Sequence, residues 1–593
     1  MLDSLTYPPM RSPPLEDPPL NAATRPPLRS RTWFGPAVAA ALTLFAVLVT
    51  LDPADCRPGM PEGPGVAIDE SFNVEMGVYL VEAFRSYGIA SLHSASQIEI
   101  FEGYNPDHPP LGRAWLGVFH AAAQAVAPAD VEGPFVTVSA RVGSAFAFAL
   151  TVLAVGWMTG SRFGAIAGTL AATSLALMPR LFGHAHLASL ETITGLTWTL
   201  TVLSTGLLWS REGGPTDRVA FGTGFLLGLA LLTKIQAIIL PPLVVLWALS
   251  HWRKQALRPL AIWGLVGGVV FVVGWPWLWS DLPGRLADYF GRTTGRVPLN
   301  VWYMGEKIAD RDVAWHYPWI LFLVTVPPGL QLFAAAGVLR FGRKFQHRPE
   351  LTLLLGSVMA PLILFSMPGV AVYDGVRLFL VSFPGWAVFA GLGGALLYEW
   401  LSTELALLPD GRTSDATSAQ TTSAKPKAVR LAERLKLTRV RHPGIILAAV
   451  FSGQAMGLVW THPYQLSYYN AFVGGPNGAE KLGFETTYWG DSLSRSLLLE
   501  VARRVPDGST IDLAPVLHPF QVDVVQSQAP VLRRHNLTLR AYDPENSNGD
   551  YLLVFHRKAD MPRPSDLKSA GWKILVATHR QGTILASFYQ RTE

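Results

Sequence analysis

Long apolar runs separated by short polar segments dominate the pattern of this 593-residue chain. Eleven of the runs reach or approach the roughly 17–25 residues that an α-helix needs to cross a bilayer. They occupy residues 34–51, 139–158, 163–180, 189–209, 219–233, 235–250, 259–279, 317–339, 351–370, 376–399 and 443–461. The pattern predicts a mostly α fold, a polytopic membrane helix bundle with about 11 transmembrane helices.

The positions of lysine and arginine predict the orientation of this bundle. Basic residues gather in segments 251–258, 340–348 and 400–442, and cytoplasmic loops of membrane proteins carry an excess of such residues. With eleven spans and a cytoplasmic N-terminus, all three segments lie in the cytoplasm. We therefore expect a multi-pass protein of the inner (plasma) membrane whose C-terminal region is extracytoplasmic.

The first outer loop, residues 52–138, contains two amphipathic stretches. Residues 111–128 are apolar enough to span the bilayer, but a further span would place the basic segments on both sides of it. We therefore predict a helix that lies in the membrane interface or docks on the bundle. Helical spacing predicts a second interfacial helix, with apolar residues at Val74, Val78, Val81 and Phe84. Loops of this length are usually functional.

The pattern divides the chain into three regions. These are a Pro-rich, disordered cytoplasmic tail at 1–33, a transmembrane domain at 34–461 with a cytoplasmic linker at 400–442, and an extracytoplasmic domain at 462–593. Alternating apolar residues in the last region predict strands at Thr510–Leu513, Tyr551–Phe555, Lys573–Ala577 and Thr583–Phe588, with a helix at Leu493–Val505. The region is therefore expected to be a small α/β domain.

Composition agrees with a membrane protein and narrows the partners. Only 15% of the residues are charged, against about 25% in soluble domains. The net charge of +5 reflects basic loops between spans, so it indicates the lipid bilayer and no nucleic acid. Cys56 is the only cysteine, so no disulfide can form within the chain.

Two acidic residues, Asp69 and Glu70, follow the first span. A carboxylate held at the bilayer surface loses part of its hydration and becomes more basic, so it can take a proton from an acceptor hydroxyl. Adjacent residues need not point the same way, so one can be catalytic while the other is structural. The alternative is a pair of ordinary solvated carboxylates near the membrane.

A rigid corner lies later in the same loop. His108 precedes Pro109 and Pro110, which force an extended conformation and position the side chain at low entropic cost. The alternative is an exposed histidine in a turn, and Arg113 nearby can equally be an interfacial anchor. Lys234, between two apolar runs, requires a partner or water; a phosphate or snorkelling of the side chain satisfies it.

These motifs resemble glycosyltransferase family 39, the protein O-mannosyltransferases and aminoarabinose transferases of the GT-C superfamily. That family carries an Asp-Glu pair after the first span, then His-Pro-Pro-Leu-Gly-Lys, then an arginine that opens the next span. The corresponding residues here are Asp69-Glu70, the run from His108 to Arg113, and Arg141. Arg113 replaces the family's lysine, which keeps the charge but changes the donor geometry.

Further segments add to the resemblance. Glu191 follows a short outer loop where the family usually has Asp, and Arg377 precedes a span as in the family's arginine-containing approach. The stretch 461–490 is similar to the segment after the last span of many bacterial family members. His184 and His186 are interpreted as part of a polar turn, because two histidines alone give weak support for a metal site.

The resemblance implies a GT-C glycosyltransferase that moves a mannose-like hexose or a pentose from a polyprenyl-phosphate sugar to a protein or glycolipid hydroxyl. Asp69 is expected to be the general base, with Glu70 and His108 orienting or binding the substrates. Candidates for the donor phosphate and substrate are Arg113, Arg141, Glu191, Lys234 and Arg377. No cofactor beyond the donor is assigned, and a divalent metal is not indicated.

Two other classes of function remain open at this point. A transporter or flippase of lipid-linked or small polar solutes predicts charges within the spans and inverted repeats. In this sequence the charges cluster at the outer ends of spans and no repeat is detected. A non-catalytic membrane scaffold whose outer domain binds a partner is the other alternative.

Overall fold

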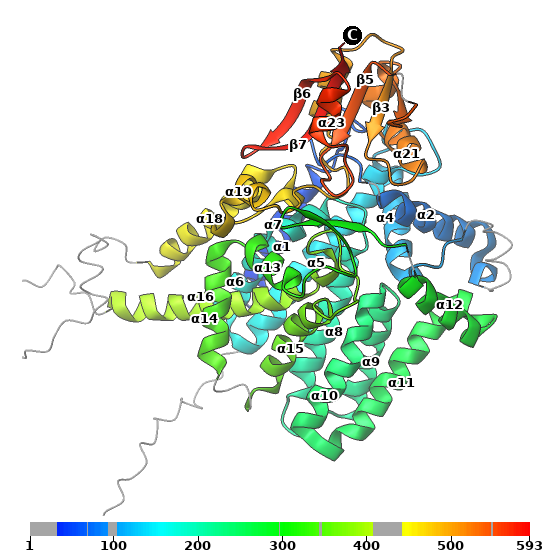
Figure 1. The fold of residues 1–593 in the computed structure, drawn as a ribbon. Coiled ribbons are helices and arrows are strands. Elements are labelled where there is room, and N and C mark those ends of the chain that lie inside the picture. The colour runs from blue at the N-terminus through cyan, green and yellow to red at the C-terminus, as the bar shows by residue number, and fades with distance from the viewer. Residues whose placement is uncertain are drawn as a thin grey trace, which may run out of the picture.

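The computed structural model describes residues 32–67, 69–92, 104–295, 297–342, 347–406, 442–546 and 549–592. The expected N-terminal tail lies outside the described residues except for 32 and 33. Most of the expected linker, 407–441, lies outside them as well. Within the described residues the chain is mostly helical, with a mixed sheet near its C-terminal end (Figure 1).

Helices occur at the position of every predicted span. They are α1 (Phe34–Leu48), α5 (Thr137–Phe163), α6 (Ala165–Ala176), α7 (Pro179–Ala185), α8 (Glu191–Trp209), α9 (Asp217–Leu231), α10 (Leu240–Trp252), α11 (Leu257–Val273), α13 (Tyr317–Thr325), α14 (Pro328–Phe341), α15 (Pro349–Leu364), α16 (Ser382–Ala406) and α18 (Pro443–Thr461). Short 3₁₀ turns join or extend them at η2 (Ile235–Ile239), η3 (Arg253–Ala256), η4 (Pro276–Trp279) and η6 (Arg377–Phe379).

Length and composition identify the helices that can cross a membrane. Among the described residues, three stretches pass this test: Thr137–Phe163, Ile235–Val273 and Pro443–Thr461. The number rises to five if two bent pairs, α6 with α7 and α13 with α14, each count as one span. The protein is therefore a multi-pass membrane protein, and the count of eleven spans stays a prediction.

The predicted span 317–339 is broken, with a bend of 112° between α13 and α14. Pro327 and Pro328 cause the break, because proline lacks the N–H that would continue the helical hydrogen bonds. Side chains satisfy the freed carbonyls: Asn470 donates to the Leu323 and Val326 oxygens at 2.8 and 2.7 Å. This contact joins the stretch after α18 to the helical bundle.

The first outer loop contains the two helices expected from its apolar spacing, α2 (Glu70–Tyr87) and α4 (Pro110–Val126), with η1 (Gly88–Leu92) after α2. They pack backbone to backbone: a Cβ on Gly117 would lie 2.0 Å from the Gly77 carbonyl oxygen. The amphipathic helix α12 (Leu282–Gly295) lies near this pair (Figure 1). Close α2–α4 packing brings the start of α2 and the proline corner together.

The loop after α12 contains a hairpin that the hydropathy pattern did not predict. Strands β1 (Asn300–Tyr303) and β2 (Glu306–Ala309) pair antiparallel around Met304 and Gly305. Both turn residues have positive φ, 53° and 85°, as a two-residue hairpin of the primed type requires. The Gly305 N–H donates to the Gly483 carbonyl at 3.0 Å, so the hairpin contacts the C-terminal region.

The C-terminal region forms a five-stranded mixed sheet of order β4-β3-β5-β7-β6. Its strands are β3 (Thr510–Ala514), β4 (Thr538–Ala541), β5 (Tyr551–Phe555), β6 (Trp572–Arg580) and β7 (Thr583–Arg591). The central strands β3 and β5 are parallel, whereas β7 runs antiparallel to both β5 and β6. Four of these strands coincide with the predicted ones; β4 was not predicted.

Helical turns surround this sheet and connect it to the bundle. They are η8 (Gln465–Ser467), η9 (Ala471–Val473), α19 (Gly475–Lys481), α20 (Arg495–Ala502), α21 (Phe520–Gln528), α22 (Pro530–Arg534) and α23 (Pro564–Ser569). The sheet stands at one end of the helical bundle, above α7, α4 and α19 in the view of Figure 1. Gln528 ties it to the start of α5, accepting from the Thr137 N–H at 2.8 Å and donating to the Phe135 carbonyl at 3.0 Å.

Candidate functional site

A buried cluster of charges lies where α2, α8 and η6 begin and α9 ends. Arg377 is its centre: its Nη1 lies 2.5 Å from Asp69 Oδ2 and its Nε lies 2.7 Å from Glu191 Oε1. The same Glu191 oxygen accepts from Lys234 Nζ at 2.6 Å. Four residues that the sequence analysis singled out separately are therefore in direct contact.

Each of these charges occupies an end of an element. Asp69 is the N-cap residue of α2, and Glu191 is the first residue of α8. A carboxylate at a helix N-terminus is stabilised by the helix dipole. Lys234 is extended, with φ −161° and ψ 152°, at the break between α9 and η2. The cluster thus forms where apolar helices stop, because charged groups are costly inside an apolar span.

The carboxylates of the site differ in their access to solvent. The Asp69 side chain is 31% exposed, whereas those of Glu191 and Asp374 are 2% and 5% exposed. An incoming hydroxyl group can therefore reach Asp69 more readily than the other two. Lys234 donates one of its three ammonium protons to Glu191. Within the part of the chain that the structure describes, the other two protons can be donated to a ligand.

His108 lies beside this cluster at the proline corner. Pro109 is extended, with ψ 158°, and Pro110 opens α4, and two consecutive prolines restrict the backbone at this corner. The His108 Nδ1 is buried, with no hydrogen-bond partner among the described residues. Burial, together with the charges of Arg113 and Lys234, lowers the pKa of His108 well below its usual range. The imidazole is therefore neutral at pH 7, where one ring nitrogen can accept a hydrogen bond.

Glu70 and Arg141 form a separate, fully buried ion pair. Arg141 Nε and Nη2 contact the two Glu70 carboxylate oxygens at 2.8 and 2.7 Å. The guanidinium also donates to the carbonyls of Leu51, Pro64 and Gly65 at 2.7 to 3.0 Å. The pair therefore fastens three segments together, and the guanidinium's contacts are with protein groups.

The Glu70 carboxylate also accepts hydrogen bonds from backbone N–H groups. Its carboxylate accepts from the Ala67 N–H at 2.8 Å and from the Ala188 N–H at 2.6 Å. A carboxylate in this environment has its lone pairs committed to backbone and guanidinium donors. The side chain is 1% exposed, so a substrate hydroxyl has no path to it comparable with the path to Asp69.

Arg113 is 2% exposed. It donates to the Asn105 carbonyl and, at 3.4 Å, to the Asn73 side chain of α2. These contacts link the proline corner to α2. They fix the Arg113 side chain at the corner, and its expected contact with the donor phosphate stays a prediction.

An apolar cavity of about 500 Å³ opens beside the proline corner. Its walls come from α2, η1 and α4, and it includes Arg85 and Ser91. Pro110, Leu111 and Leu232 are among its lining residues, and each lies within three residues of His108 or Lys234 in the sequence. An apolar chain in this cavity would therefore bring its polar end toward the charge cluster.

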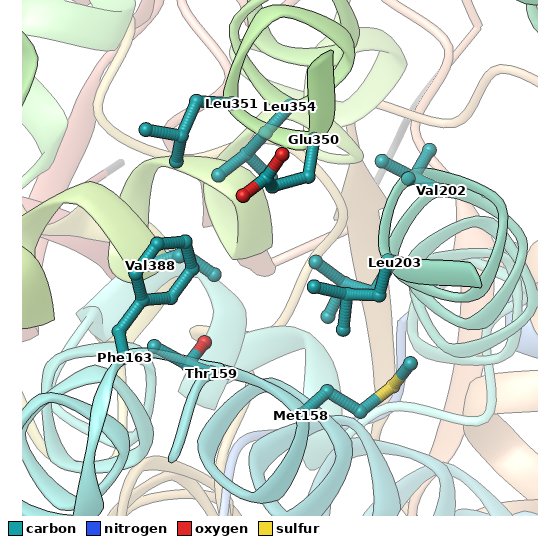
Figure 2. Close-up of a pocket in the computed structure, with 11 residues that line it drawn as sticks. Met158, Thr159, Phe163, Val202, Leu203, Glu350, Leu351, Leu354 and Val388 are labelled. Atoms are coloured by element: carbon teal, nitrogen blue, oxygen red, sulfur yellow. The ribbon is translucent and has the colours of Figure 1, made fainter. Parts of the chain in front are cut away.

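A second cavity, between α5, α8 and α15, is much smaller. Figure 2 shows Glu350 among apolar side chains that include Leu203, Leu351 and Leu354. Its volume of about 20 Å³ is enough for about one water molecule. Arg162 lies 2.8 Å from the Glu350 carboxylate, so this position is occupied by a structural ion pair.

Three residues that the sequence analysis did not assign to the site contribute to it. Asp374 accepts from Arg377 at 3.2 Å and from Trp489 Nε1 at 2.9 Å, and Arg557 Nη1 lies 3.3 Å from its other oxygen. The Arg377 guanidinium also lies over the Trp489 ring, 4.5 Å from its centre. In the sequence, the charge of Asp374 beside Gly375 could have marked this residue as part of the site. Nothing in the sequence marked Arg557, which lies far along the chain from the other site residues.

The histidines of the polar turn contact neighbouring side chains. His184 packs edge-on against Trp489. His186 contacts the Thr50 hydroxyl at 2.9 Å and the Phe182 carbonyl at 2.8 Å. In the described part of the chain, no group of three or more His, Cys, Asp or Glu side chains is arranged to hold a metal ion.

The fold and the cluster define an integral membrane protein with a carboxylate–cation site beside an apolar cavity. Residues 108–279 match the model of the family described as dolichyl-phosphate-mannose-protein mannosyltransferase. The resemblance predicted from the motifs is confirmed by this match. Over this segment the chain is thus similar to a family of membrane glycosyltransferases.

Comparison with solved structures gives distant similarities. ArnT from Cupriavidus metallidurans in the apo state is 13% identical over 94% of this chain and 97% of its own, with a TM-score of 0.46. The same protein bound to undecaprenyl phosphate is 13% identical over 93% and 97%, with a TM-score of 0.45. The oligosaccharyltransferase AglB from Archaeoglobus fulgidus, with an inhibitory peptide and a dolichol-phosphate, is 14% identical over 95% and 74%, with a TM-score of 0.44. No curated protein sequence matches the chain.

Proposed function

We propose that this protein transfers a mannose-like hexose or a pentose from a polyprenyl-phosphate donor to an acceptor hydroxyl at the outer face of the membrane. The observation that carries the proposal is the convergence of Asp69, Glu191, Lys234 and Arg377 in one contact network. These residues come from four separate parts of the chain. Their types match a general base and cations for a leaving phosphate.

The apolar cavity supports a lipid donor. Its end at Leu111 and Leu232 lies next to Lys234, whose remaining ammonium protons can bind a phosphate oxygen. The neutral His108 at the corner can accept a hydrogen bond from a sugar hydroxyl. A polyprenyl chain in the cavity therefore places its phosphate and sugar between Lys234 and Asp69.

The transfer step uses the exposed carboxylate. Asp69 takes the proton of the acceptor hydroxyl as its oxygen attacks the anomeric carbon. The bond between that carbon and the phosphate oxygen breaks, and polyprenyl phosphate leaves with the bonding electrons. Lys234 and Arg377 stabilise the negative charge that develops on the phosphate. A single displacement of this kind inverts the anomeric centre.

From the buried geometry we infer roles for four residues that differ from those the family resemblance implied. Glu70 and Arg141 hold the loop after α1 against α5, and Arg113 holds the corner against α2. We infer that all three act by positioning the site, without contacting the donor or the acceptor. Glu191 orients Lys234 and Arg377 in place of binding substrate itself.

The proposal as a whole is tested in the source organism. Mass spectrometry of membrane glycolipids and outer-face proteins should show that one sugar modification is missing when the gene is deleted. The wild-type gene should restore that modification, and the gene for Asp69→Asn should not. An unchanged set of modifications in the deletion strain would contradict transfer to either class of acceptor.

Lys234→Met is expected to weaken donor binding by about 10- to 150-fold, because one charge-assisted contact to phosphate is worth about 1.5–3 kcal/mol. Binding of polyprenyl phosphate to the purified protein measures this effect. The variant Lys234→Met/Glu191→Gln also removes the carboxylate that has lost its lysine partner, and it should bind as weakly. Lys254→Ala, an exposed cation of η3, is the control and should bind normally. Wild-type affinity in Lys234→Met would reject the phosphate contact.

The proposed orientation places the C-terminal sheet outside the cell. In a Cys56→Ser background, a cysteine at Ser565, an exposed residue of α23, should react with an impermeant thiol reagent in intact cells. A cysteine at Ser418, within the basic segment after α16, should react only after the membrane is permeabilised. The reverse labelling would overturn the orientation and place the site on the cytoplasmic side.

A further inference from the structure

We propose that Arg557, from the C-terminal sheet region, is a positioning residue that sets the orientation of Arg377 through Asp374. The inference rests on the proposed function, because the orientation of Arg377 matters for transfer. It also means that the helical bundle alone does not complete the site. The C-terminal region would then supply a part of the transfer machinery.

The contacts form a continuous chain of charges. Arg557 Nη1 lies 3.3 Å from Asp374 Oδ1, and Asp374 Oδ2 lies 3.2 Å from Arg377 Nη1. The first contact is an ion pair by distance without the angle of a good hydrogen bond, since Oδ1 has no hydrogen-bond partner among the described residues. It therefore acts through charge, which at 6% and 5% side-chain exposure is weakly screened.

Arg377 passes this constraint to the reacting groups. The same Nη1 that faces Asp374 lies 2.5 Å from Asp69, and the Nε of this guanidinium contacts Glu191. A rotation of the guanidinium would change the direction of both carboxylates at once. Trp489, which also belongs to the C-terminal region, donates to Asp374 and covers Arg377, so the region contacts this arginine network twice.

Arg557 is itself firmly held. Its Nε contacts Asp560 at 2.9 Å, and its Nη1 donates to the Tyr488 carbonyl at 3.0 Å. The next two backbone N–H groups, of Lys558 and Ala559, both donate to the Glu485 carboxylate at 3.1 Å. The loop after β5 is thus fixed on a buried carboxylate, and burial raises the pKa of Glu485 to about 7. Because Arg557 is fixed in this way, its guanidinium can hold the Asp374 carboxylate in one orientation.

Packing of the C-terminal region against the bundle would not by itself require that Arg557 pair with Asp374. An arginine that only filled space would not need a carboxylate of the bundle that is shared with the site. Asp374 has φ 54°, in the region that favours glycine, so the backbone there is held in an uncommon conformation beside Gly375. The strained position points the carboxylate at both Arg377 and Arg557, which is the geometry that a relay between the two needs.

The test is a double-mutant cycle on sugar transfer with the full-length protein in liposomes. Arg557→Gln should lower kcat about tenfold while the donor KM changes less than about threefold, because contacting residues couple at this level and Lys234 still binds the phosphate. Arg557→Gln/Asp374→Asn should be no slower than Asp374→Asn alone. Arg557→Lys, which keeps the charge, should recover part of the rate.

The control is Arg503→Gln, which removes an exposed ion pair of α20 in the same region. Its kcat and donor KM should equal those of wild type. Effects of Arg557→Gln and Asp374→Asn that multiply in the double variant would overturn the relay and leave the proposed function standing. A loss confined to donor KM would also overturn it. Absence of transfer by wild type would contradict the proposed function and the relay together.

Discussion

Asp69→Asn is expected to lower the rate of sugar transfer by about 10²- to 10⁴-fold, the usual contribution of a general base. The substitution keeps the size of the side chain and removes its ability to take a proton. Arg377 is the buried partner of Asp69, whose own side chain is 31% exposed. When Asp69 loses its charge, Arg377 keeps its ion pairs with Glu191 and Asp374, so no buried ion is left without a partner. Protein level and donor affinity should persist.

Single-turnover transfer in liposomes measures this effect, with the donor in excess. Glu82→Gln, an exposed residue of the same helix α2, is the matched control and should transfer at the wild-type rate. Near-normal turnover by Asp69→Asn together with a complete loss in Glu191→Gln would move the base to Glu191. A fully active Asp69→Asn/Glu191→Gln variant would show that neither carboxylate is the base.

Glu70→Gln and Arg141→Gln are expected to destabilise the protein by about 3–5 kcal/mol each, because each leaves one charge of a buried pair without its partner. The pair is 1% and 0% exposed and fastens the loop after α1, the start of α2 and α5. Any loss of activity should follow the loss of folded protein, in contrast to Asp69→Asn.

Thermal unfolding in detergent at one fixed scan rate detects this difference, since unfolding of membrane proteins is often irreversible. Arg258→Gln breaks an ion pair with Asp217 in which the side chains are 80% and 46% exposed. Such pairs contribute about 0–1 kcal/mol, so this variant should melt close to wild type. If Glu70→Gln melted at the wild-type temperature but bound the donor more weakly, Arg141 would instead be a residue that binds the donor.

The helices of the bundle were predictable because apolar runs of this length admit few other structures in a membrane. Helices stand at all eleven predicted positions, and α2 and α4 follow the apolar spacing of the first outer loop. The break between α13 and α14 was encoded by Pro327-Pro328, but hydropathy averages over such a pair. The same averaging conceals the bend between α6 and α7.

The strands that were missed are short or at an edge. Of the four residues of β4, only Leu539 is buried, so the strand lacks the alternation that marked its neighbours. The hairpin β1–β2 has strands of four residues and a Met-Gly turn, which is a weak hairpin signal beside Asn-Gly or Asp-Gly.

Part of the candidate site could be read from the sequence, because charges at the ends of apolar spans are costly and therefore conspicuous. Lys234 stood out on this ground, whereas Glu191 and Arg377 were named from the family resemblance, and the structure places all three in contact. The sequence analysis favoured Asp69 over Glu70 as the base, but it could not reveal that these adjacent carboxylates enter two separate ion pairs. Arg557 could not be found, because its contact with Asp374 exists only after the C-terminal sheet has docked.

The most direct measurement follows one reaction in liposomes that contain the purified protein, a polyprenyl-phosphate sugar and an acceptor. Wild type should release polyprenyl phosphate and form glycosylated acceptor in equal amounts, Asp69→Asn should do neither at a comparable rate, and nucleotide sugars should not replace the donor. Transfer from a nucleotide sugar, or movement of the intact donor across the bilayer without cleavage of its sugar–phosphate bond, would contradict the account.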